Sequence, residues 1–220
     1  MLTSYERLKI LSLRTPIARS YFDRKDERIA AHWVDEGRIG PPPESYKVKL
    51  LRRIAELMGP EAFVETGTYW GQTTARLAPY FKLLHTIELD PELYKLASRR
   101  FASDPKIHVH FGDSGSELPR ILEALDGPVL FWLDAHRAGS MSSGGDYVPI
   151  FAELDAIARH KRANDHVIVV DDAQYFVGTQ GYPTVEAVRS HAQSLGFRNY
   201  NLHAFVMIFD NRGGLDSIEV

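Results

Sequence analysis

Five carboxylates stand at the ends of five short apolar segments of the sequence: Glu65, Glu88, Asp113, Asp134 and Asp171. In an open parallel sheet the carboxyl ends of the strands face one crevice, where ligands bind. A single acid at such a position commonly caps the next helix. Five in succession, with glycines beside the first, instead favour a shared ligand site.

The first of these turns reads Glu65-Thr-Gly67-Thr68-Tyr-Trp-Gly71. Its glycines allow a tight turn, and a helix that begins near Gly71 would direct amide N–H groups at a ligand. The pattern matches neither the G-x-G-x-x-G dinucleotide fingerprint nor a P-loop. Because a carboxylate repels a pyrophosphate, Glu65 favours a ligand that carries an ammonium group.

The next two acids suit the remainder of a nucleoside. Glu88 ends the second apolar segment, where a carboxylate can accept hydrogen bonds from both hydroxyls of a ribose. Asp113, followed by Ser114, ends the third segment and is placed to receive an adenine amino group. The sequence therefore predicts a nucleoside-containing cofactor.

Three more carboxylates form a second group. Asp134-Ala-His136 follows the fourth apolar segment, and Asp171-Asp172 follows the fifth. Carboxylates that converge repel one another unless a cation or a proton lies between them. Hard oxygen ligands without sulfur favour Mg²⁺, completed by water and substrate oxygens. Asp134, Asp171 and Asp172 are the predicted metal ligands. The alternative is that Asp171 or Asp172 only caps the next element.

Over roughly residues 45–210 the chain resembles the class I S-adenosylmethionine-dependent methyltransferases. The segment Glu65–Gly71 is similar to their first motif, Ile87-Glu88 to the second and Gly112-Asp113-Ser114 to the third. The resemblance implies that the methionine part of the cofactor lies near 65–71, with Gly67, Thr68 and Gly71 beside it. It also implies that the ribose lies at Glu88 and the adenine near 113–114, and that Asp134 borders the cofactor.

The acidic triad resembles that of metal-dependent O-methyltransferases that modify sugar hydroxyls of antibiotics, the macrocin and aminocoumarin types. Catechol O-methyltransferase is a looser match, since its third ligand is an amide where this chain has Asp172. The resemblance implies Mg²⁺-assisted, in-line methyl transfer to a sugar or phenolic hydroxyl of a small molecule. Asp134 or His136 would take the hydroxyl proton. Histidine is a common proton acceptor near neutral pH, although a structural role for His136 stays open.

Two loops are expected to shape the acceptor site. The segment 136–146 is rich in glycine and serine, and the segment 174–183 carries Tyr175, Phe176 and Tyr182, which could stack on a sugar or aryl ring. Two other functions stay open. A Rossmann oxidoreductase that uses NAD lacks its glycine pattern here, and a non-catalytic methyltransferase-fold binding protein would not need the acids.

The hydrophobic pattern predicts the strands and helices that position these residues. Short apolar runs alternate with helical stretches, which predicts a Rossmann-like α/β fold with helices on both faces of a mostly parallel sheet. The expected strands are 62–64, 83–87, 107–111, 129–133 and 167–170, with an antiparallel closing pair at 198–203 and 204–209. The expected helices are 44–58, 71–80, 91–102, 116–125, 149–160 and 184–195.

The prolines of Gly40-Pro-Pro-Pro-Glu44 cannot continue a helix. They divide a helical amino-terminal extension, 1–43, from the cofactor-binding domain, 44–220. The extension is expected to be a lid or the arm of a homodimer. The basic residues near Lys47 and Lys49 are expected to lie on a solvated helix face. His108 and His110 are expected to be structural.

Composition narrows the partners. Apolar residues make up 44% of the chain and charged residues 25%, as in globular proteins with a full core. The net charge of −3 provides no general attraction to nucleic acid or to an anionic membrane. The chain has no cysteine, which excludes disulfides and thiolate chemistry. No run reaches the ~18 apolar residues of a membrane span, so we expect a cytoplasmic protein.

Overall fold

Strand pairing in the computed structural model, which describes residues 16–134, 148–216 and 218, forms a single seven-stranded sheet. The order is β3-β2-β1-β4-β5-β7-β6. β1 to β5 are parallel to one another, whereas β7 runs antiparallel to both β5 and β6. The strands are β1 Ala62–Thr66, β2 Leu83–Glu88, β3 Ile107–Phe111, β4 Val129–Leu133, β5 Val167–Val170, β6 Asn199–His203 and β7 Val206–Asp210. The predicted fold class is confirmed.

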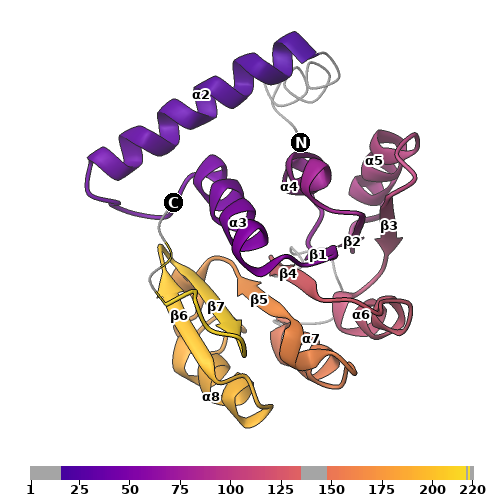
Figure 1. Cartoon of the computed structure of the whole chain (residues 1–220), viewed down its shortest axis with the longest axis vertical. Coiled ribbons are helices and arrows are strands. Elements are labelled where there is room, and N and C mark those ends of the chain that lie inside the picture. Colours follow the sequence, from indigo (N-terminus) through magenta and orange to yellow (C-terminus); the bar gives the residue numbers. More distant parts are fainter. Residues whose placement is uncertain (1–15, 135–147, 217, 219–220) are drawn as a thin grey trace.

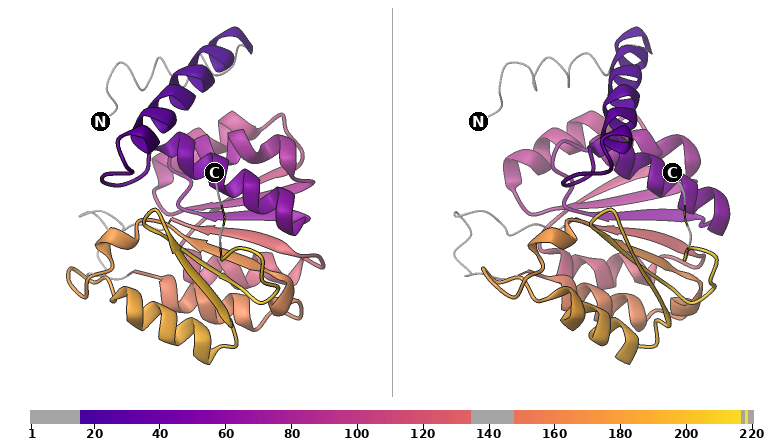
Figure 2. Two further views of the ribbon diagram at one scale, coloured as in Figure 1. Left: turned by 60° about the vertical axis from the view of Figure 1, so that its left-hand side comes forward. Right: turned by 90° about the vertical axis from the view of Figure 1, so that its left-hand side faces the viewer.

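Helices cover both faces of the sheet (Figures 1 and 2). One face carries α3 Glu44–Met58, α4 Gln72–Leu77 and α5 Pro91–Phe101. The other carries α6 Ser114–Glu123, α7 Ile150–Ala158 and α8 Val185–Ser194. Short 3₁₀ turns lie at Ala78–Tyr80, Ala163–Asp165 and Ala173–Tyr175. Because both faces are covered, the central strands are apolar on both sides, as their continuous apolar runs indicated.

Each central strand supplies side chains to two separate cores. In β1, Phe63 packs with the α3, α4 and α5 side of the sheet, and Val64 packs with the α6, α7 and α8 side. Successive side chains of a strand point to opposite faces, and both of these are fully buried. The two cores hold the strand ends in fixed register, which positions the acids.

Helix α2, Pro16–Asp35, projects away from the sheet and meets the domain at its carboxyl-terminal end (Figure 1). The ring of Trp33 lies 4.8 Å from that of Tyr46 on α3, measured between centroids. The indole N–H of Trp33 donates to the carbonyl of Ile39 at 3.1 Å, which fixes the turn after the helix. The predicted break before Glu44 is present. The role of 1–43 as a lid or dimer arm stays a prediction.

Several element boundaries differ from the expected ones for local reasons. The expected helix 71–80 is a short α4 followed by a 3₁₀ turn that contains Pro79, whose ring disfavours the preceding α-turn. α6 begins two residues early, at Ser114, because Asp113 caps it. Among the described residues, no helix is long and apolar enough to cross a membrane.

Candidate active site

The register of the central strands brings the acids to one edge of the sheet. Thr66 at the end of β1 pairs with Leu133 of β4, and Leu133 pairs with Val170 of β5. The ladder continues one residue further, because Asp134 N–H donates to Thr66 O and Asp171 N–H donates to Leu133 O, both at 3.1 Å. Asp134 and Asp171 therefore stand side by side at the carboxyl ends of β4 and β5.

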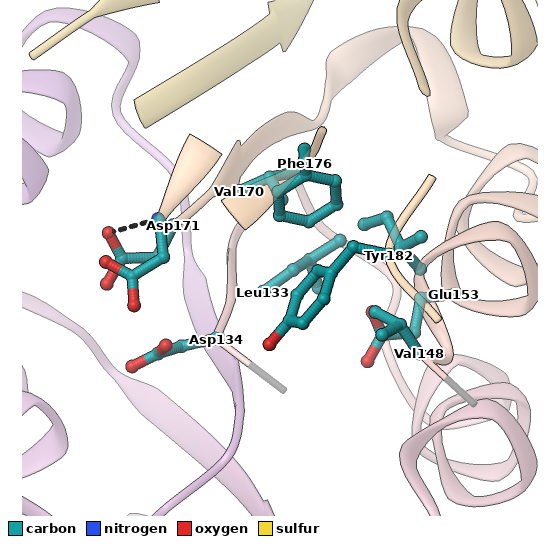
Figure 3. Close-up of a pocket in the computed structure, with 10 residues that line it drawn as sticks. Leu133, Asp134, Val148, Glu153, Val170, Asp171, Phe176 and Tyr182 are labelled. Carbon is teal, nitrogen blue, oxygen red and sulfur yellow. Dashed lines mark hydrogen bonds between the residues drawn. The ribbon is translucent and has the colours of Figure 1, made fainter. Parts of the chain in front are cut away.

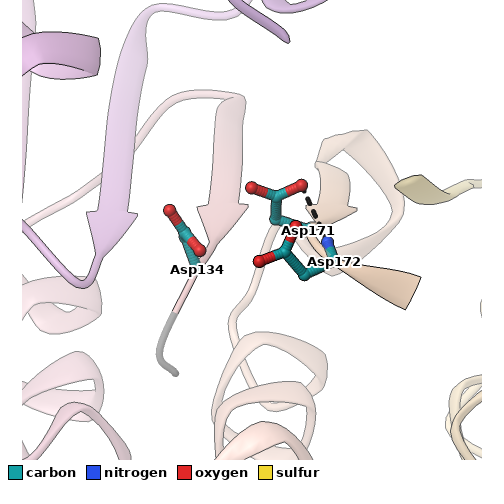
Figure 4. Close-up of side chains that lie close together, drawn as sticks. All are labelled: Asp134, Asp171 and Asp172. Atoms are coloured by element: carbon teal, nitrogen blue, oxygen red, sulfur yellow. Dashed lines mark hydrogen bonds between the residues drawn. The ribbon is translucent and has the colours of Figure 1, made fainter. Parts of the chain in front are cut away.

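The three predicted metal ligands come together, as Figure 4 shows. One carboxylate oxygen each of Asp134, Asp171 and Asp172 lies within 4.8 Å of the other two. Asp171 is 4% exposed, and the other two are partly buried. The spacing and the all-oxygen donor set suit a hard divalent cation.

Asp172 has a strained backbone at this site. Its φ is +55°, a left-handed conformation that costs a non-glycine residue about 1–2 kcal/mol. The strain is offset locally, since Asp172 N–H donates to Oδ1 of Asp171 at 2.7 Å and Gln174 Nε2 donates to Oδ1 of Asp172 at 3.0 Å. The carboxylates of Asp171 and Asp172 both lie within reach of that of Asp134.

Lys47 supplies a positive charge to the same acids. Its ammonium Nζ lies 2.5 Å from Asp171 Oδ2 and 3.2 Å from Asp172 Oδ1. The side chain is only 12% exposed. The expectation that Lys47 lies on a solvated helix face is therefore wrong. The adjacent residues of α3, Tyr46 and Val48, are buried, so this part of the helix packs against the rest of the domain. The Lys47 side chain contacts the acids and is largely shielded from solvent.

Burial and charge act in opposite directions on these groups. Burial raises the pKa of Asp171 well above its usual range, the nearby Asp134 raises it further, and Lys47 opposes both. For Lys47, burial lowers the pKa of the ammonium, but Asp171, with Asp172 and Asp134, raises it overall. The Lys47 ammonium thus supplies a positive charge that offsets part of the repulsion among these carboxylates.

Glu65 lies inside β1 and is 2% exposed. Its Oε2 accepts hydrogen bonds from Thr74 Oγ1 at 2.5 Å and from Thr86 Oγ1 at 2.7 Å. Burial raises the pKa of Glu65 to about 8, with the two hydroxyls opposing this rise. A buried acid held at the crevice edge is suited to a cationic ligand group, whose charge would favour the ionised form.

Glu88 ends β2 and is 7% exposed. Its two carboxylate oxygens hold neighbouring turns, since Tyr69 N–H donates to Oε2 at 2.7 Å and Asp90 N–H donates to Oε1 at 2.9 Å. Burial raises the pKa of Glu88, and these backbone donors oppose the rise. The carboxylate is thus fixed beside the loop that follows β1, where the ribose is predicted.

The glycines of that loop have the conformations that the prediction required. Gly67 has φ +85° and Gly71 has φ +63°. The amides of Gly67 and Thr68 both donate to Ile87 O, at 3.0 and 3.1 Å, so they bind the neighbouring strand. The hydroxyl of Thr68 lies 2.6 Å from that of Thr86. These contacts show how the loop is anchored, and its contact with a cofactor stays a prediction.

Asp113 caps a helix, which is the structural role that was the alternative to ligand binding for each of the five acids. Its Oδ1 accepts from Ser116 N–H at 3.2 Å, which caps the amino terminus of α6. Ser114, the first residue of α6, is 7% exposed. These capping contacts use one carboxylate oxygen of Asp113. Binding of an adenine near 113–114 stays a prediction.

A pocket opens beside the triad (Figure 3). Its walls are the side chains of Leu133, Asp134, Val148, Ile150, Glu153, Val170, Asp171, Asp172, Phe176 and Tyr182. The acids of the triad lie at one end, Glu153 lies on the other side, and the remaining lining residues are apolar or aromatic (Figure 3). The rings of Phe176 and Tyr182 are in edge-to-face contact at 5.3 Å between centroids, so these two aromatics line the pocket together. Tyr175 lies next to them and is 51% exposed.

Two residues of this region were missed in the sequence. Lys47 was predicted to belong to a basic, solvated helix face, and its contacts with Asp171 and Asp172 identify it as a site residue. Glu153, in the first turn of α7, is 1% exposed, and its Oε1 has no hydrogen-bond partner in the part of the chain described. Burial raises the pKa of Glu153 to about 7, with the hydroxyls of Ser114 and Thr66 opposing. The sequence feature that could have identified Glu153 is an acid in the first turn of a largely apolar helix, IFAELDAIA.

His136 and the loop 136–146 lie outside the described residues, so the choice between Asp134 and His136 as the base stays open. The other predicted site residues fall into two groups along one sheet edge. Asp134, Asp171 and Asp172 are in contact range of one another, and Glu65 and Glu88 lie on the neighbouring β1 and β2. The electrostatic influence of Asp134 on the pKa of Glu65 links the two groups.

No model of a known protein family matches the sequence, and no curated protein matches it. Solved structures do match the fold. An O-methyltransferase from Bacillus cereus in complex with S-adenosylhomocysteine is 16% identical with a TM-score of 0.56, and the match covers 84% of this chain and 89% of that one. TomG, an O-methyltransferase from Streptomyces achromogenes involved in tomaymycin synthesis and solved with S-adenosylmethionine, is 18% identical with a TM-score of 0.57, covering 95% and 99%.

The N-methyltransferase NodS from Bradyrhizobium japonicum is also similar, at 14% identity and a TM-score of 0.51, covering 76% of this chain and 93% of that one. The chain therefore has the fold of class I S-adenosylmethionine-dependent methyltransferases. The similar structures include O-methyltransferases and an N-methyltransferase, so the shared fold does not identify a methylated atom.

Proposed function

We propose that this chain is an S-adenosylmethionine-dependent methyltransferase that methylates a hydroxyl of a small molecule, a sugar or a phenol, with the help of Mg²⁺. The observation that carries the proposal is the row of acids along one sheet edge. Glu65 on β1 and Glu88 on β2 would bind a nucleoside cofactor, and three acids converge after β4 and β5. In open α/β sheets this edge is where ligands bind.

The cofactor half rests on charge and shape. Glu65 is suited to the ammonium of the methionine moiety, and Glu88 to the ribose hydroxyls. The tight conformations at Gly67 and Gly71 allow the loop after β1 to curve around a ligand. Asp113 and Ser114 stand at the next strand end, beside the predicted place of the adenine.

The metal would be held by Asp134, Asp171 and Asp172, the described acids with suitable oxygen spacing. When bound, Mg²⁺ supplies Lewis acidity that lowers the pKa of a hydroxyl it coordinates. The acids of the triad hold that hydroxyl in place. Asp134, or His136 in the following segment, accepts its proton as the methyl group is transferred.

The pocket beside the triad is the proposed acceptor site. Its walls of Leu133, Val170, Phe176 and Tyr182 are apolar or aromatic and suit the face of a ring. Its acidic end accepts hydrogen bonds from hydroxyl groups. Because the nearby acids outnumber the single lysine, the pocket favours an uncharged or cationic acceptor over an anionic one.

Calorimetric titration with S-adenosylhomocysteine tests the cofactor assignment. We expect micromolar binding to the wild type, with and without Mg²⁺, and its loss in Glu88→Ala. The exposed Glu92 on α5 provides the matched control, and Glu92→Ala should bind like the wild type. Loss of turnover with a chelator would support the metal. Chelator-insensitive turnover would remove the metal and leave methyl transfer intact.

Two other functions are distinguished by the same experiment. A Rossmann oxidoreductase has the parallel order 3-2-1-4-5-6, whereas β7 here is antiparallel between β5 and β6. Stabilisation by NAD and not by S-adenosylhomocysteine would favour it nonetheless. A non-catalytic binding protein would bind no S-adenosylhomocysteine, even at millimolar ligand.

A further inference from the structure

Lys47 reaches the acidic triad from a helix, whereas the three acids follow strands. It belongs to α3, which packs on the sheet, whereas Asp171 and Asp172 follow β5. Its Nζ is 2.5 Å from Asp171 Oδ2 and 3.2 Å from Asp172 Oδ1. An ion pair this buried differs from the exposed pairs of the chain, such as Lys95 with Glu92, where both side chains are more than half exposed.

The ammonium and a divalent ion would use the same carboxylates. Mg²⁺ requires carboxylate oxygens at about 2.0–2.1 Å, and these oxygens now accept hydrogen bonds from Nζ. Two cations held on the same carboxylates would repel each other strongly in a site of this burial. Binding of one of them therefore weakens binding of the other.

We propose that Lys47 is an internal counter-ion that competes with a divalent cation for Asp171 and Asp172, so that a metal binds only when the Lys47 side chain withdraws. The proposal rests on the metal site of the proposed function and adds a residue that sets its affinity. Lys47 would thus hold the empty triad together and weaken metal binding by the same contacts.

Burial gives the physical reason for such a residue. Asp171 is 4% exposed, and Asp134 and Asp172 lie beside it. Charges buried together without a cation are strongly destabilising. In the absence of metal, the Lys47 ammonium provides the compensation, and the triad can exist in a folded protein before any metal or substrate arrives.

The test is direct binding of Mn²⁺, a hard cation with the same ligand preference as Mg²⁺, measured by calorimetry and by electron paramagnetic resonance. Lys47→Met removes the ammonium and keeps the length of the side chain. We expect Lys47→Met to bind Mn²⁺ more tightly than the wild type, by roughly ten-fold or more. Mn²⁺ should also raise the melting temperature of Lys47→Met more than that of the wild type.

Lys49→Met is the matched control, because Lys49 lies on the same helix and is also partly buried. It should bind Mn²⁺ like the wild type. Equal Mn²⁺ affinity of the wild type and Lys47→Met, or weaker binding by the variant, would overturn the proposal. So would absence of Mn²⁺ binding in both.

Lys47→Gln provides a second variant, since a neutral amide can still donate a hydrogen bond to one carboxylate. If Lys47→Met folds only in the presence of Mn²⁺, that outcome supports the proposal. If neither variant folds with Mn²⁺ present, the proposal is wrong, because the metal would then be unable to replace the ammonium. Binding of S-adenosylhomocysteine by the wild type reports separately on the proposed function.

Discussion

Thr86 Oγ1 donates a hydrogen bond of 2.7 Å to Oε2 of Glu65, and the two residues are direct partners on the neighbouring strands β2 and β1. The pairing places a polar contact inside a sheet that is otherwise apolar at this level. With Thr74 donating to the same oxygen, the acid is held at the edge of the crevice. Its position follows from strand register and does not depend on a flexible loop.

The raised pKa of Glu65 predicts that cofactor binding depends on pH. The pKa is about 8 without ligand, so most of the acid is protonated at pH 7. Binding of an ammonium group favours the ionised form and must release that proton. Affinity for S-adenosylhomocysteine should therefore rise between pH 6 and pH 8, by up to ten-fold per unit, and level off above pH 8.

Calorimetry in two buffers with different ionisation enthalpies would measure the proton release. Glu65→Gln should bind more weakly, and its affinity should not change over this pH range. Binding that is independent of pH in the wild type would show that Glu65 does not face the ammonium.

Substitution of Gly71 by alanine should destabilise the fold for two separable reasons, backbone strain and a steric clash. A Cβ at Gly71 would lie 2.6 Å from Cε2 of the buried Phe101, and φ is +63°. Gly59, which ends α3 with φ +59°, has nothing within 4 Å of such a Cβ. Gly59→Ala should cost about 1 kcal/mol from strain alone, and Gly71→Ala about 2–4 kcal/mol.

Urea unfolding would measure both variants. Gly71→Ala should also weaken S-adenosylhomocysteine binding, because the loop after β1 must shift away from Phe101. Equal stability losses in the two variants would show that the collision is relieved without cost.

Most of the fold could be predicted because its signals are local. The apolar runs that became β1, β2, β3, β4 and β5 are short and separated by helical stretches, and a parallel sheet follows from that alternation. The boundaries were less accurate where a single side chain decides them. β1 extends through Glu65 and Thr66, since Glu65 pairs with Thr86 and Trp132 on its two sides.

Only the site residues at the ends of strands could be predicted from the sequence. Asp134, Asp171 and Asp172 were brought together by sheet topology, which the sequence pattern indicates. Lys47 and Glu153 reach the site from helices, and their part in it depends on how those helices pack on the sheet. Lys47 and Lys49 are two positions apart on α3 and point to different faces of the helix, and Lys47 is identified by its contacts with Asp171 and Asp172.

His166 predicts a loss of stability at mildly acidic pH. The side chain is fully buried, its Nδ1 accepts from Val129 N–H at 3.2 Å, and its Nε2 lies 2.7 Å from Nδ1 of His160. His160 Nε2 contacts Leu125 O at 2.8 Å. With Nδ1 accepting, the proton of neutral His166 lies on Nε2 and is donated to His160, which in turn donates to the carbonyl.

Burial and, to a smaller extent, the neighbouring His160 together lower the pKa of His166 to about 4. The unfolded chain binds a proton here at about pH 6.5, whereas the folded protein resists it. The contribution of neutral His166 to the free energy of unfolding is fully present above pH 6.5. It is lost as the pH falls toward 4, by up to about 3 kcal/mol. Urea unfolding at pH 7 and pH 5 should show a smaller pH dependence for His166→Gln, while His32→Gln, on the exposed part of α2, should behave as the wild type does.

Asp134 predicts a conflict between stability and turnover. Its charge raises the pKa of Asp171, which means that the two carboxylates repel each other in the folded protein. Asp134→Asn removes one of the repelling charges, and the remaining pair keeps Lys47 as its counter-ion. Removal of a proton acceptor should lower kcat by about 10²–10⁴-fold, while the melting temperature rises, as is common when functional charges are neutralised.

Thermal unfolding without metal is the appropriate measurement, because a bound cation would mask the repulsion. Asp216→Asn, an exposed acid outside the site, should leave both melting temperature and turnover unchanged. A lower melting temperature for Asp134→Asn would mean that its carboxylate stabilises the fold through contacts stronger than the repulsion from Asp171. Unchanged turnover would pass the role of base to His136.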